Sequence, residues 1–271
     1  MRKAFTVFIR PTAQQTNCIS LIKSNMEFSE DTAMIPFPDP YHCPSHLETL
    51  TRMDQLFVYK ERTREDSLAE VCFGIKPANR YFVMDCMGNK VFSVLEDSES
   101  CDRQFYGVGR LFTMNVTDHS NQEVIIMVHP AVCTFCSHEL EVQSPPGTTI
   151  GYVRQNWHVC LPKFTLENER GEPAIKIVGP CVGCTCCTDE NFELVSLNEA
   201  AIDRSFGKIT KPFSCCGSNA DFVIRFPSNM DVKMKATALG ACILIDTMYF
   251  SWEKGYRAVP NPPTLANIPV S

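Results

Sequence analysis

The sequence has no excess of basic residues and no recognisable secretory leader. Its 25 Lys and Arg residues are outnumbered by 31 Asp and Glu residues, which gives a net charge of −6 and argues against a dominant nucleic-acid-binding surface. Near the amino terminus, Arg2 and Lys3 precede only a short apolar stretch, which Arg10 and Pro11 end before the usual length of a signal peptide. We therefore expect a reducing, cytosolic compartment and no nucleic-acid partner.

The sequence also lacks the short motifs of common enzymes. It contains no G-x-S-x-G, no phosphate-binding or dinucleotide-binding glycine motif in the right context, and no H-E-x-x-H. The six histidines have no metal-ligand spacing, and a lone histidine is more often structural than catalytic. These absences predict a protein that is neither a hydrolase nor a nucleotide enzyme.

Cysteine, in contrast, is abundant, with 15 residues in a chain of 271. Secreted disulfide scaffolds are usually much smaller, so we interpret the cysteines as core residues, lipid-attachment sites or metal ligands. Cys133 with Cys136 and Cys181 with Cys184 form two C-x-x-C pairs that could bind zinc tetrahedrally. The distance between the pairs exceeds that of a usual zinc ribbon, so a zinc-stabilised signalling domain is the weaker alternative and zinc is not the expected cofactor.

The order of apolar runs predicts one β-rich domain, 46–252, between two loose segments. Residues 1–45 show no sustained period and 253–271 are rich in proline, so both are expected to be flexible arms. Residues 46–70 fit a helix or a strand equally well. From about 70 to 230, apolar runs are joined by polar turns in repeated strand–turn–strand units. This pattern indicates an up-and-down antiparallel sheet.

An apolar helix is predicted at the end of this domain, over about 232–252. Residues 236–252 are nearly all apolar or small, with the exception of Asp246. A helix that is apolar on every side is buried in protein or in lipid. The run is shorter than the ~20 residues that a bilayer span needs, and a carboxylate inside a bilayer is costly. We favour burial in protein and keep a transmembrane helix as the alternative.

An ordered set of segments is similar to the core of phospholipid scramblases. The segments are ELEVQSPPG (139–147), IGYV (150–153), LPKFTLEN (161–168), IVGPC (177–181), GKITK (207–211), DVKMKA (231–236) and LGACILID (239–246). The likeness runs in the family's order from about residue 46 to 252. It implies a mainly β protein with a Tubby-like fold, a closed antiparallel β-barrel around a C-terminal apolar helix. The helix would have to be apolar all round to fit inside such a barrel.

The resemblance also implies a function. Members of the phospholipid scramblase family are associated with ATP-independent, calcium-linked, bidirectional movement of phospholipids between membrane leaflets. This movement is not chemical catalysis. The expected partners are a phospholipid membrane and other proteins. The expected location is the cytosolic side of the plasma membrane, with other membranes or the nucleus as alternatives. A non-transporting adaptor that docks on anionic lipids is the alternative function.

The calcium-binding segment implied by the family is degenerate in this chain. Relatives carry an acidic run similar to D-x-D-N-F-G-I-x-x-P-x-D just before the final helix, and three of its acids correspond to Ser218, Ala220 and Asn229 here. Calcium takes about six to eight oxygen ligands, so we predict weak or absent calcium binding. The residues of this segment are Ser218, Ala220, Asp221, Phe222, Ile224, Asn229 and Asp231.

Two further groups of candidate residues follow from the same resemblance. Thioester acylation needs exposed thiols, and two chains anchor a protein more firmly than one; ordinary turn cysteines are the alternative interpretation. The palmitoylation candidates are Cys133, Cys136, Cys184, Cys186 and Cys187. The residues expected to act in the membrane or core helix, with the lysines and the aspartate near its polar boundaries, are Lys233, Lys235, Leu239, Ile243, Ile245 and Asp246.

Overall fold

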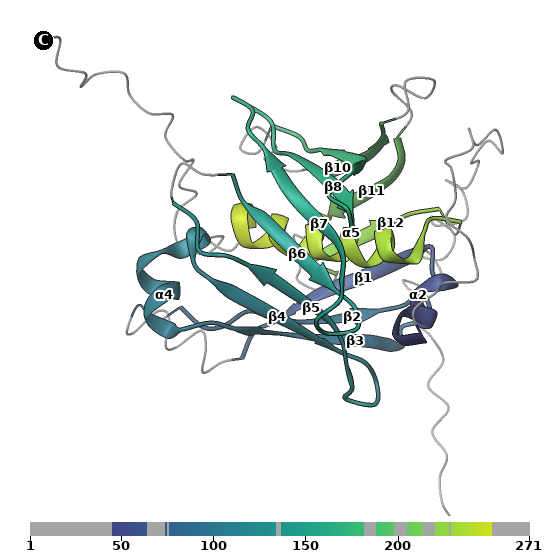
Figure 1. Ribbon diagram of the computed structural model, residues 1–271, viewed down its shortest axis with the longest axis horizontal. Helices are drawn as coiled ribbons and strands as arrows, with labels where there is room; N and C mark the ends of the chain where they lie inside the picture. The colour runs from purple at the N-terminus through teal and green to yellow at the C-terminus, as the bar shows by residue number, and fades with distance from the viewer. Residues whose placement is uncertain are drawn as a thin grey trace, which may run out of the picture. The chain divides into compact units, whose positions relative to one another are not determined.

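The computed structural model describes most of the chain between residues 45 and 250, namely 45–63, 74, 76–133, 137–181, 188–197, 205–213, 220–227 and 229–250. Within these residues, twelve strands join into one closed barrel, and the paired neighbours are antiparallel (Figure 1). The predicted fold class, a mainly β closed antiparallel barrel with a C-terminal helix, is therefore confirmed. The Tubby-like name stays a prediction.

The strands lie around the barrel in chain order. They are β1 (Gln55–Glu61), β2 (Arg80–Met84), β3 (Lys90–Asp97), β4 (Phe112–Thr117), β5 (Glu123–His129), β6 (Glu139–Gln143), β7 (Thr149–Asn156), β8 (Lys163–Asn168), β9 (Pro173–Val178), β10 (Glu190–Ser196), β11 (Ser205–Lys211) and β12 (Phe222–Arg225). The helical elements are η2 (Ser45–Leu47), α2 (Glu48–Thr51), α4 (Ser100–Phe105), η3 (Gly107–Gly109), α5 (Val232–Ile245) and the π-helical turn η5 (Asp246–Phe250).

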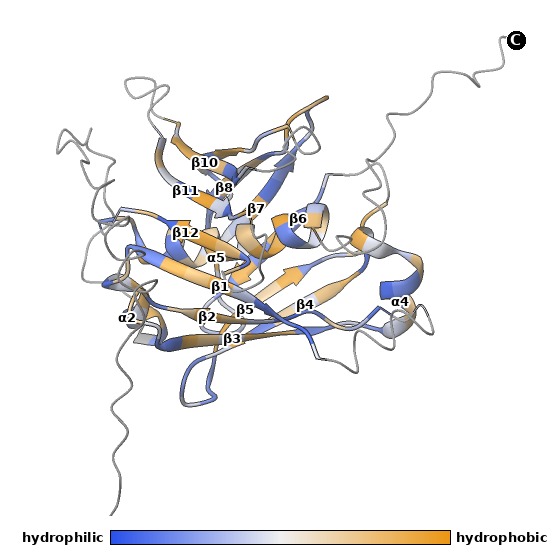
Figure 2. Ribbon diagram, turned by 180° about the vertical axis from the view of Figure 1, so that it is seen from behind, coloured by the Kyte–Doolittle hydropathy of each residue, from blue (hydrophilic) through white to orange (hydrophobic). Residues whose placement is uncertain are grey.

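Strand β1 closes the barrel because it pairs with β2 on one side and with β12 on the other. Leu56 lies opposite Ile224, and Val58 lies opposite Val83. All four side chains are buried, as expected where alternate residues of a strand face one apolar side. Apolar residues are concentrated in the strands and in α5 (Figure 2). Closure pairs the edge strands with each other, which removes the exposed edges of an open sheet.

The strand–turn–strand units expected from the sequence are present as β2–β3, β4–β5 and β8–β9. Their turns are stabilised locally by polar side chains. Asp85 accepts hydrogen bonds from the backbone amides of Met87 and Asn89, and Asp118 does the same for Ser120 in the β4–β5 turn. Turns of this kind follow from the sequence alone, because aspartate bonds backbone amides two to four residues ahead.

Two predicted segments differ in detail from the structure. Residues 46–70, which fitted helix or strand, contain both, since η2 and α2 precede β1; residues 64–70 lie outside the described residues. The predicted helix 232–252 is an α-helix only to Ile245 and continues as the π-helical turn to Phe250.

Helix α5 runs through the inside of the barrel, where it packs against β6, β7, β8 and β12 (Figure 1). Two glycines lie where the helix and the wall approach each other. A Cβ added to Gly151 of β7 would lie 2.7 Å from Oγ1 of Thr237, and one added to Gly240 would lie 3.0 Å from Cγ2 of Val142. The absence of a side chain at these positions lets the helix and the wall come this close without a shift of their neighbours.

The barrel has two different ends, which we name after the helices that lie at them in Figure 1. Odd-numbered strands run from the α2 end to the α4 end, and even-numbered strands run back. Helix α5 begins at the α2 end, where Lys235 contacts the backbone of α2. It finishes at the α4 end, where Asp246 contacts Lys60 near the end of β1.

Candidate functional site

The apolar side chains of α5 form the centre of the barrel core. Leu239, Ile243 and Ile245, which the sequence assigned to a core or to a membrane, are fully buried. They belong to one apolar cluster with the inward-facing residues of the wall. Of the two alternatives for the helix, burial in protein is the one observed in this structure. In the part of the chain that the structure describes, no helix combines the length and the apolarity needed to cross a membrane.

At the α4 end, α5 is held by a buried ion pair. Oδ2 of Asp246 lies 2.7 Å from Nζ of Lys60 and accepts a second hydrogen bond, also 2.7 Å long, from the hydroxyl of Tyr81. The side chain of Lys60 is 9% exposed and that of Asp246 is 4% exposed. We call Asp246, Lys60 and Tyr81 the carboxylate anchor.

The carboxylate anchor is charged. Burial by itself would raise the pKa of Asp246, but the Lys60 ammonium and the hydrogen bonds from Lys60 and Tyr81 hold this pKa below its usual value. Burial, and then the nearby Asp246 charge, raise the pKa of Tyr81 well above its usual value, so its hydroxyl stays a donor. The carboxyl end of a helix repels a negative charge. The Lys60 ammonium offsets this repulsion and so stabilises the Asp246 carboxylate at that position.

At the α2 end, α5 is held by a buried lysine. The side chain of Lys235 is buried rather than solvated, and Nζ donates to the carbonyl oxygens of Leu50, Thr51 and Met53 at 3.1, 3.1 and 2.6 Å. Carbonyls at a helix end need donors and favour a positive charge, so this lysine ties α5 to the end of α2. We call this contact the lysine anchor. Lys233 is partly exposed and lies 3.5 Å from Glu169 at its nearest atoms.

A second group of buried polar side chains lies at the α4 end, between β3 and β6. Oε1 of Glu96 lies 2.7 Å from Nη2 of Arg110. Nδ1 of His129 donates to the carbonyl oxygen of Arg110, and Nε2 of His129 accepts from Nδ1 of His138, each at 2.9 Å. Burial lowers the pKa of His129 to about 4 and also lowers the pKa of His138, so both rings are neutral at pH 7.

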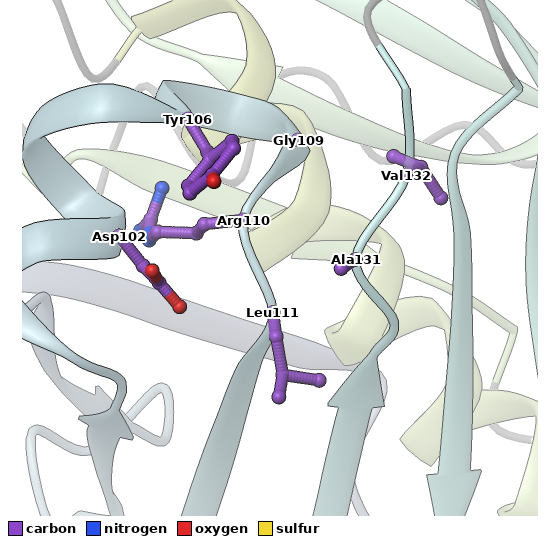
Figure 3. A pocket seen from close by; sticks show the side chains of 7 residues that line it. All are labelled: Asp102, Tyr106, Gly109, Arg110, Leu111, Ala131 and Val132. Carbon is purple, nitrogen blue, oxygen red and sulfur yellow. The ribbon is translucent and has the colours of Figure 1, made fainter.

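A pocket of about 360 Å³ opens beside this polar group (Figure 3). The Arg110 guanidinium in its wall already donates to Glu96 and to the carbonyl oxygen of Gly107, so its charge is engaged by the protein itself. We assign the pocket no ligand. Its lining residues are Asp102, Tyr106, Gly109, Arg110, Leu111, Ala131 and Val132.

Strand β12 forms the middle of the degenerate calcium segment. Ala220, Phe222 and Ile224 are buried, and a carboxylate oxygen of Asp221 accepts a hydrogen bond of 2.7 Å from the backbone amide of Lys60. Asn229 is exposed in the turn before α5, and Ser218 lies outside the described residues.

The two remaining acids of that segment are separated by β12 itself. Asp221 precedes the strand at the α4 end and Asp231 follows it at the α2 end, directly before α5. A strand of four residues spans roughly 13 Å, too far for one ion to bridge with ligand distances of about 2.3–2.6 Å. Burial raises the pKa of Asp231. Weak or absent calcium binding at this segment stays a prediction to be measured.

The candidate acylation and zinc cysteines are described only in part. Cys136, Cys184, Cys186 and Cys187 lie outside the described residues, and Cys133 is disulfide-bonded, so acylation or zinc binding there needs the reduced form. Cys181 is partly buried. Within the described residues, no group of three or more His, Cys, Asp or Glu side chains is placed to hold a metal ion. Both assignments stay predictions.

Comparison with known proteins gives the same family as the resemblance. A family model described as Scramblase matches residues 34–252. Phospholipid scramblase 1 of Mus musculus is 43% identical over 223 residues, which cover 79% of this chain and 66% of that protein. This chain belongs to the scramblase family. Phospholipid scramblase 2 of Bos taurus is 41% identical over 230 residues, 81% of this chain and 76% of that protein, and human phospholipid scramblase family member 5 is 36% identical over 80% of this chain and 82% of its own length.

The match with phospholipid scramblase 1 extends over slightly less than two thirds of that relative's length. No solved structure matches this scramblase-family chain. The matched residues include the whole described barrel and α5.

Sequence reasoning missed the partners that hold the helix of this scramblase-family chain. Lys60 and Asp246 are 186 residues apart in the chain, and nothing local to either residue indicates the other. The signal that existed was the single carboxylate in an apolar helix, because a buried charge needs a partner. It predicted that a partner exists but not which residue supplies it.

Proposed function

We propose that this chain is a phospholipid scramblase that moves lipids in both directions between membrane leaflets without ATP, at the cytosolic side of the plasma membrane. The observation that carries the proposal is the family relation over almost the whole described domain, with 43% identity to a protein named phospholipid scramblase 1. No covalent step is involved, because lipid exchange down a gradient changes no chemical bond. Acylation at Cys133 and Cys136 would add affinity for the membrane.

In the proposed mechanism, the enclosed helix is the part that responds to the membrane. Its apolar surface is sealed from lipid as long as the carboxylate and lysine anchors hold both of its ends. Contact with the bilayer shifts the barrel towards a state in which one anchor opens and α5 reaches the interface. A ligand or surface can shift such an equilibrium only by binding one state better than the other, and the apolar helix supplies that difference.

The second candidate function is a non-transporting adaptor that binds anionic lipids. A specific observation favours it: α5 is fully enclosed and both of its ends are fixed by buried charges. The separation of Asp221 and Asp231 by β12 supports the same alternative, because an adaptor needs no calcium site in this segment. Docking then needs only the outside of the barrel.

A lipid-exchange assay separates the two functions. Purified protein is reconstituted into liposomes with a fluorescent phospholipid in both leaflets, and dithionite is added outside, in nucleotide-free buffer with calcium or with a chelator. A scramblase lets dithionite bleach well beyond the protected half of the fluorescence, and dependence on calcium decides the calcium link. Bleaching that stops near one half in both conditions, with protein still bound to the liposomes, supports the adaptor.

The thiol of Cys242 reports whether α5 leaves the barrel. This cysteine lies in the middle of α5 and is fully buried, and burial raises its pKa well above the usual value, so it resists alkylation in the closed barrel. Mass spectrometry of the peptide that contains Cys242, after brief treatment with a membrane-permeant maleimide, measures its exposure. Exchange-competent liposomes should increase its labelling, whereas exposed Cys86 in the β2–β3 turn at the α2 end serves as the control that is labelled in either state.

A further inference from the structure

Exposed apolar side chains are concentrated at one end of the barrel. Among the described residues, eight large apolar side chains are strongly exposed, and six of them belong to the α4 end. The other two are Met87, in the β2–β3 turn at the α2 end, and Leu95, on β3. Single exposed apolar residues are ordinary, but a concentration of them indicates an interaction surface. The six are Phe105, Tyr106, Leu111, Trp157, Val159 and Phe213.

These residues stand on three connections that are evenly spaced around the barrel. Phe105 and Tyr106 lie on the β3–β4 connection, Trp157 and Val159 on the β7–β8 connection, and Phe213 on the β11–β12 connection. Going around the ring, four strands separate each of these connections from the next. Contacts at three separated points of one end can hold the barrel against a broad surface. A flat partner fits this arrangement better than a narrow groove or a single peptide.

We call the exposed apolar side chains on these three connections the tips. Their chemistry suits the interface of a lipid bilayer. Trp157 and Phe105 are each 81% exposed, which leaves nearly the whole ring in solvent. Tryptophan and tyrosine favour the boundary between headgroups and hydrocarbon, where one part of the ring is dry and another is wet. The β7–β8 connection, 157–162, carries no Asp, Glu, Lys or Arg, so its insertion would bury no full charge.

Exposed carboxylates occur at both ends of the barrel, with Glu169 and Glu172 in the β8–β9 turn at the α2 end and Glu99 and Asp189 at the α4 end. Charge therefore does not choose between the two ends. The orientation follows from the exposed apolar side chains, which are concentrated at the α4 end.

We propose that Phe105, Tyr106, Trp157, Val159 and Phe213 form a docking face on which this chain stands on a phospholipid bilayer. In this orientation, the carboxylate anchor at the end of α5 lies at the membrane side, and the lysine anchor lies away from it. The proposal takes from the proposed function only the membrane as a partner, and it requires no lipid movement.

The first test compares charge insertions at the two ends. Trp157→Asp and Phe213→Asp change the docking face, and Met87→Asp is the matched control because Met87 is 83% exposed at the α2 end. Binding is measured by flotation with phosphatidylcholine vesicles that contain phosphatidylserine. Loss of one large aromatic contact should weaken binding about tenfold or more in Trp157→Asp, whereas Met87→Asp should stay within about twofold. Equal binding of all three variants and the wild type overturns the proposal.

The second test measures where the tip lies. Trp157 is one of two tryptophans, so the variant Trp252→Phe leaves it as the sole emitter. Vesicles should shift its emission to shorter wavelength, and brominated lipids should quench it. A tryptophan introduced by Met87→Trp, in a chain that also carries Trp157→Phe and Trp252→Phe, should show neither effect. A response of the tryptophan at position 87 with none at Trp157 reverses the orientation and overturns the proposal.

The outcomes separate the docking face from lipid exchange. Wild-type protein that binds vesicles through Trp157 but leaves half of the fluorescence protected from dithionite keeps the docking face and contradicts the proposed scrambling. Protein that scrambles equally well with Trp157→Asp and Phe213→Asp keeps scrambling and contradicts the docking face. Self-association that depends on Trp157, without vesicle binding, assigns the face to a second copy of the chain and also contradicts the proposal. Circular dichroism confirms that each exposed substitution leaves the fold intact.

Discussion

At the α2 end of the barrel, four of the strand connections are short hairpin turns, and three of them contain carboxylates. At the α4 end, the connections are longer and carry α4 and the exposed aromatic tips. Below those tips lie two buried polar groups, the carboxylate anchor and the Glu96, Arg110, His129 and His138 side chains. The α2 end instead places one buried ammonium against the backbone of α2.

The difference between the ends follows from what each has to do for α5. At the α2 end, residues 226–231 connect β12 to the helix, and Lys235 ties its start to the backbone of α2 and Met53. At the α4 end, the helix terminus must be held while its last turn points towards the rim. A buried ion pair holds it, and the strength of such a pair depends on exclusion of water.

The largest expected effect is at the carboxylate anchor. Asp246→Ala leaves the Lys60 ammonium buried without this carboxylate, and breaking a buried pair typically costs about 3–5 kcal/mol. Urea unfolding should show this loss in the free energy of unfolding. The double variant Lys60→Met with Asp246→Leu should recover most of it, because both charges are then absent. A loss below about 1 kcal/mol in Asp246→Ala would mean that the pair does not hold the helix.

The next largest effect is a dependence of the free energy of unfolding on pH, which arises from His129 at the α4 end. The pKa of His129 is lowered from 6.5 to about 4 by burial, so between these values the unfolded chain binds the proton more readily than the folded chain. Stability therefore falls as pH decreases through this window, by about 2 kcal/mol between pH 7 and pH 5. The midpoint of urea unfolding at both pH values measures it.

A matched pair of variants localises this pH dependence. His129→Gln should remove much of the fall between pH 7 and pH 5, since it removes the buried ring. His119→Gln, in the exposed β4–β5 turn at the α2 end, should leave the fall unchanged. An unaltered pH dependence in His129→Gln would show that other titrating groups cause the loss of stability between pH 7 and pH 5.

A smaller effect is expected at the lysine anchor. Lys235→Met removes the donor to the carbonyls of Leu50, Thr51 and Met53, but it also removes the cost of burying a charge. The net loss should be about 1–2 kcal/mol in urea unfolding, clearly below that of Asp246→Ala. A loss as large as that of Asp246→Ala would show that the two anchors contribute equally to stability and would contradict the difference between the two ends.

The smallest effect is expected from the neighbouring lysine on the surface. Lys233 and Glu169 are partly exposed and their nearest atoms are 3.5 Å apart, so Lys233→Ala should change the free energy of unfolding by about 0.5 kcal/mol or less. Thermal unfolding in low and high salt measures it, and the difference from wild type should shrink as salt screens the pair. A change larger than that of Lys235→Met would reverse the roles given to the two lysines.

The elements that the sequence predicted are those with local signals. The hairpins β2–β3, β4–β5 and β8–β9 follow from apolar runs around polar turns, and α5 follows from its continuous apolar run. The enclosure of α5 came from family resemblance, because length alone left a membrane alternative open. The same periodic reasoning could not decide residues 46–70, where a short helix and a strand follow each other.

The contacts that make the candidate site could not be predicted. Lys60, Tyr81 and Asp246 meet only because the barrel closes, and no pattern along the chain brings them together. Lys235 was expected near a polar boundary, but its stem lies in the core while its ammonium reaches backbone carbonyls. The even spacing of the aromatic tips also depends on the order of strands around the ring.

Whether this chain moves phospholipids between leaflets can be decided from the final extent of dithionite bleaching in protein-containing liposomes. We expect bleaching well beyond one half of the fluorescence in the absence of any nucleotide, with increased labelling of Cys242 in the same liposomes. Bleaching that stops at one half, with the protein bound to the vesicles and Cys242 protected, would contradict it and leave the docking adaptor.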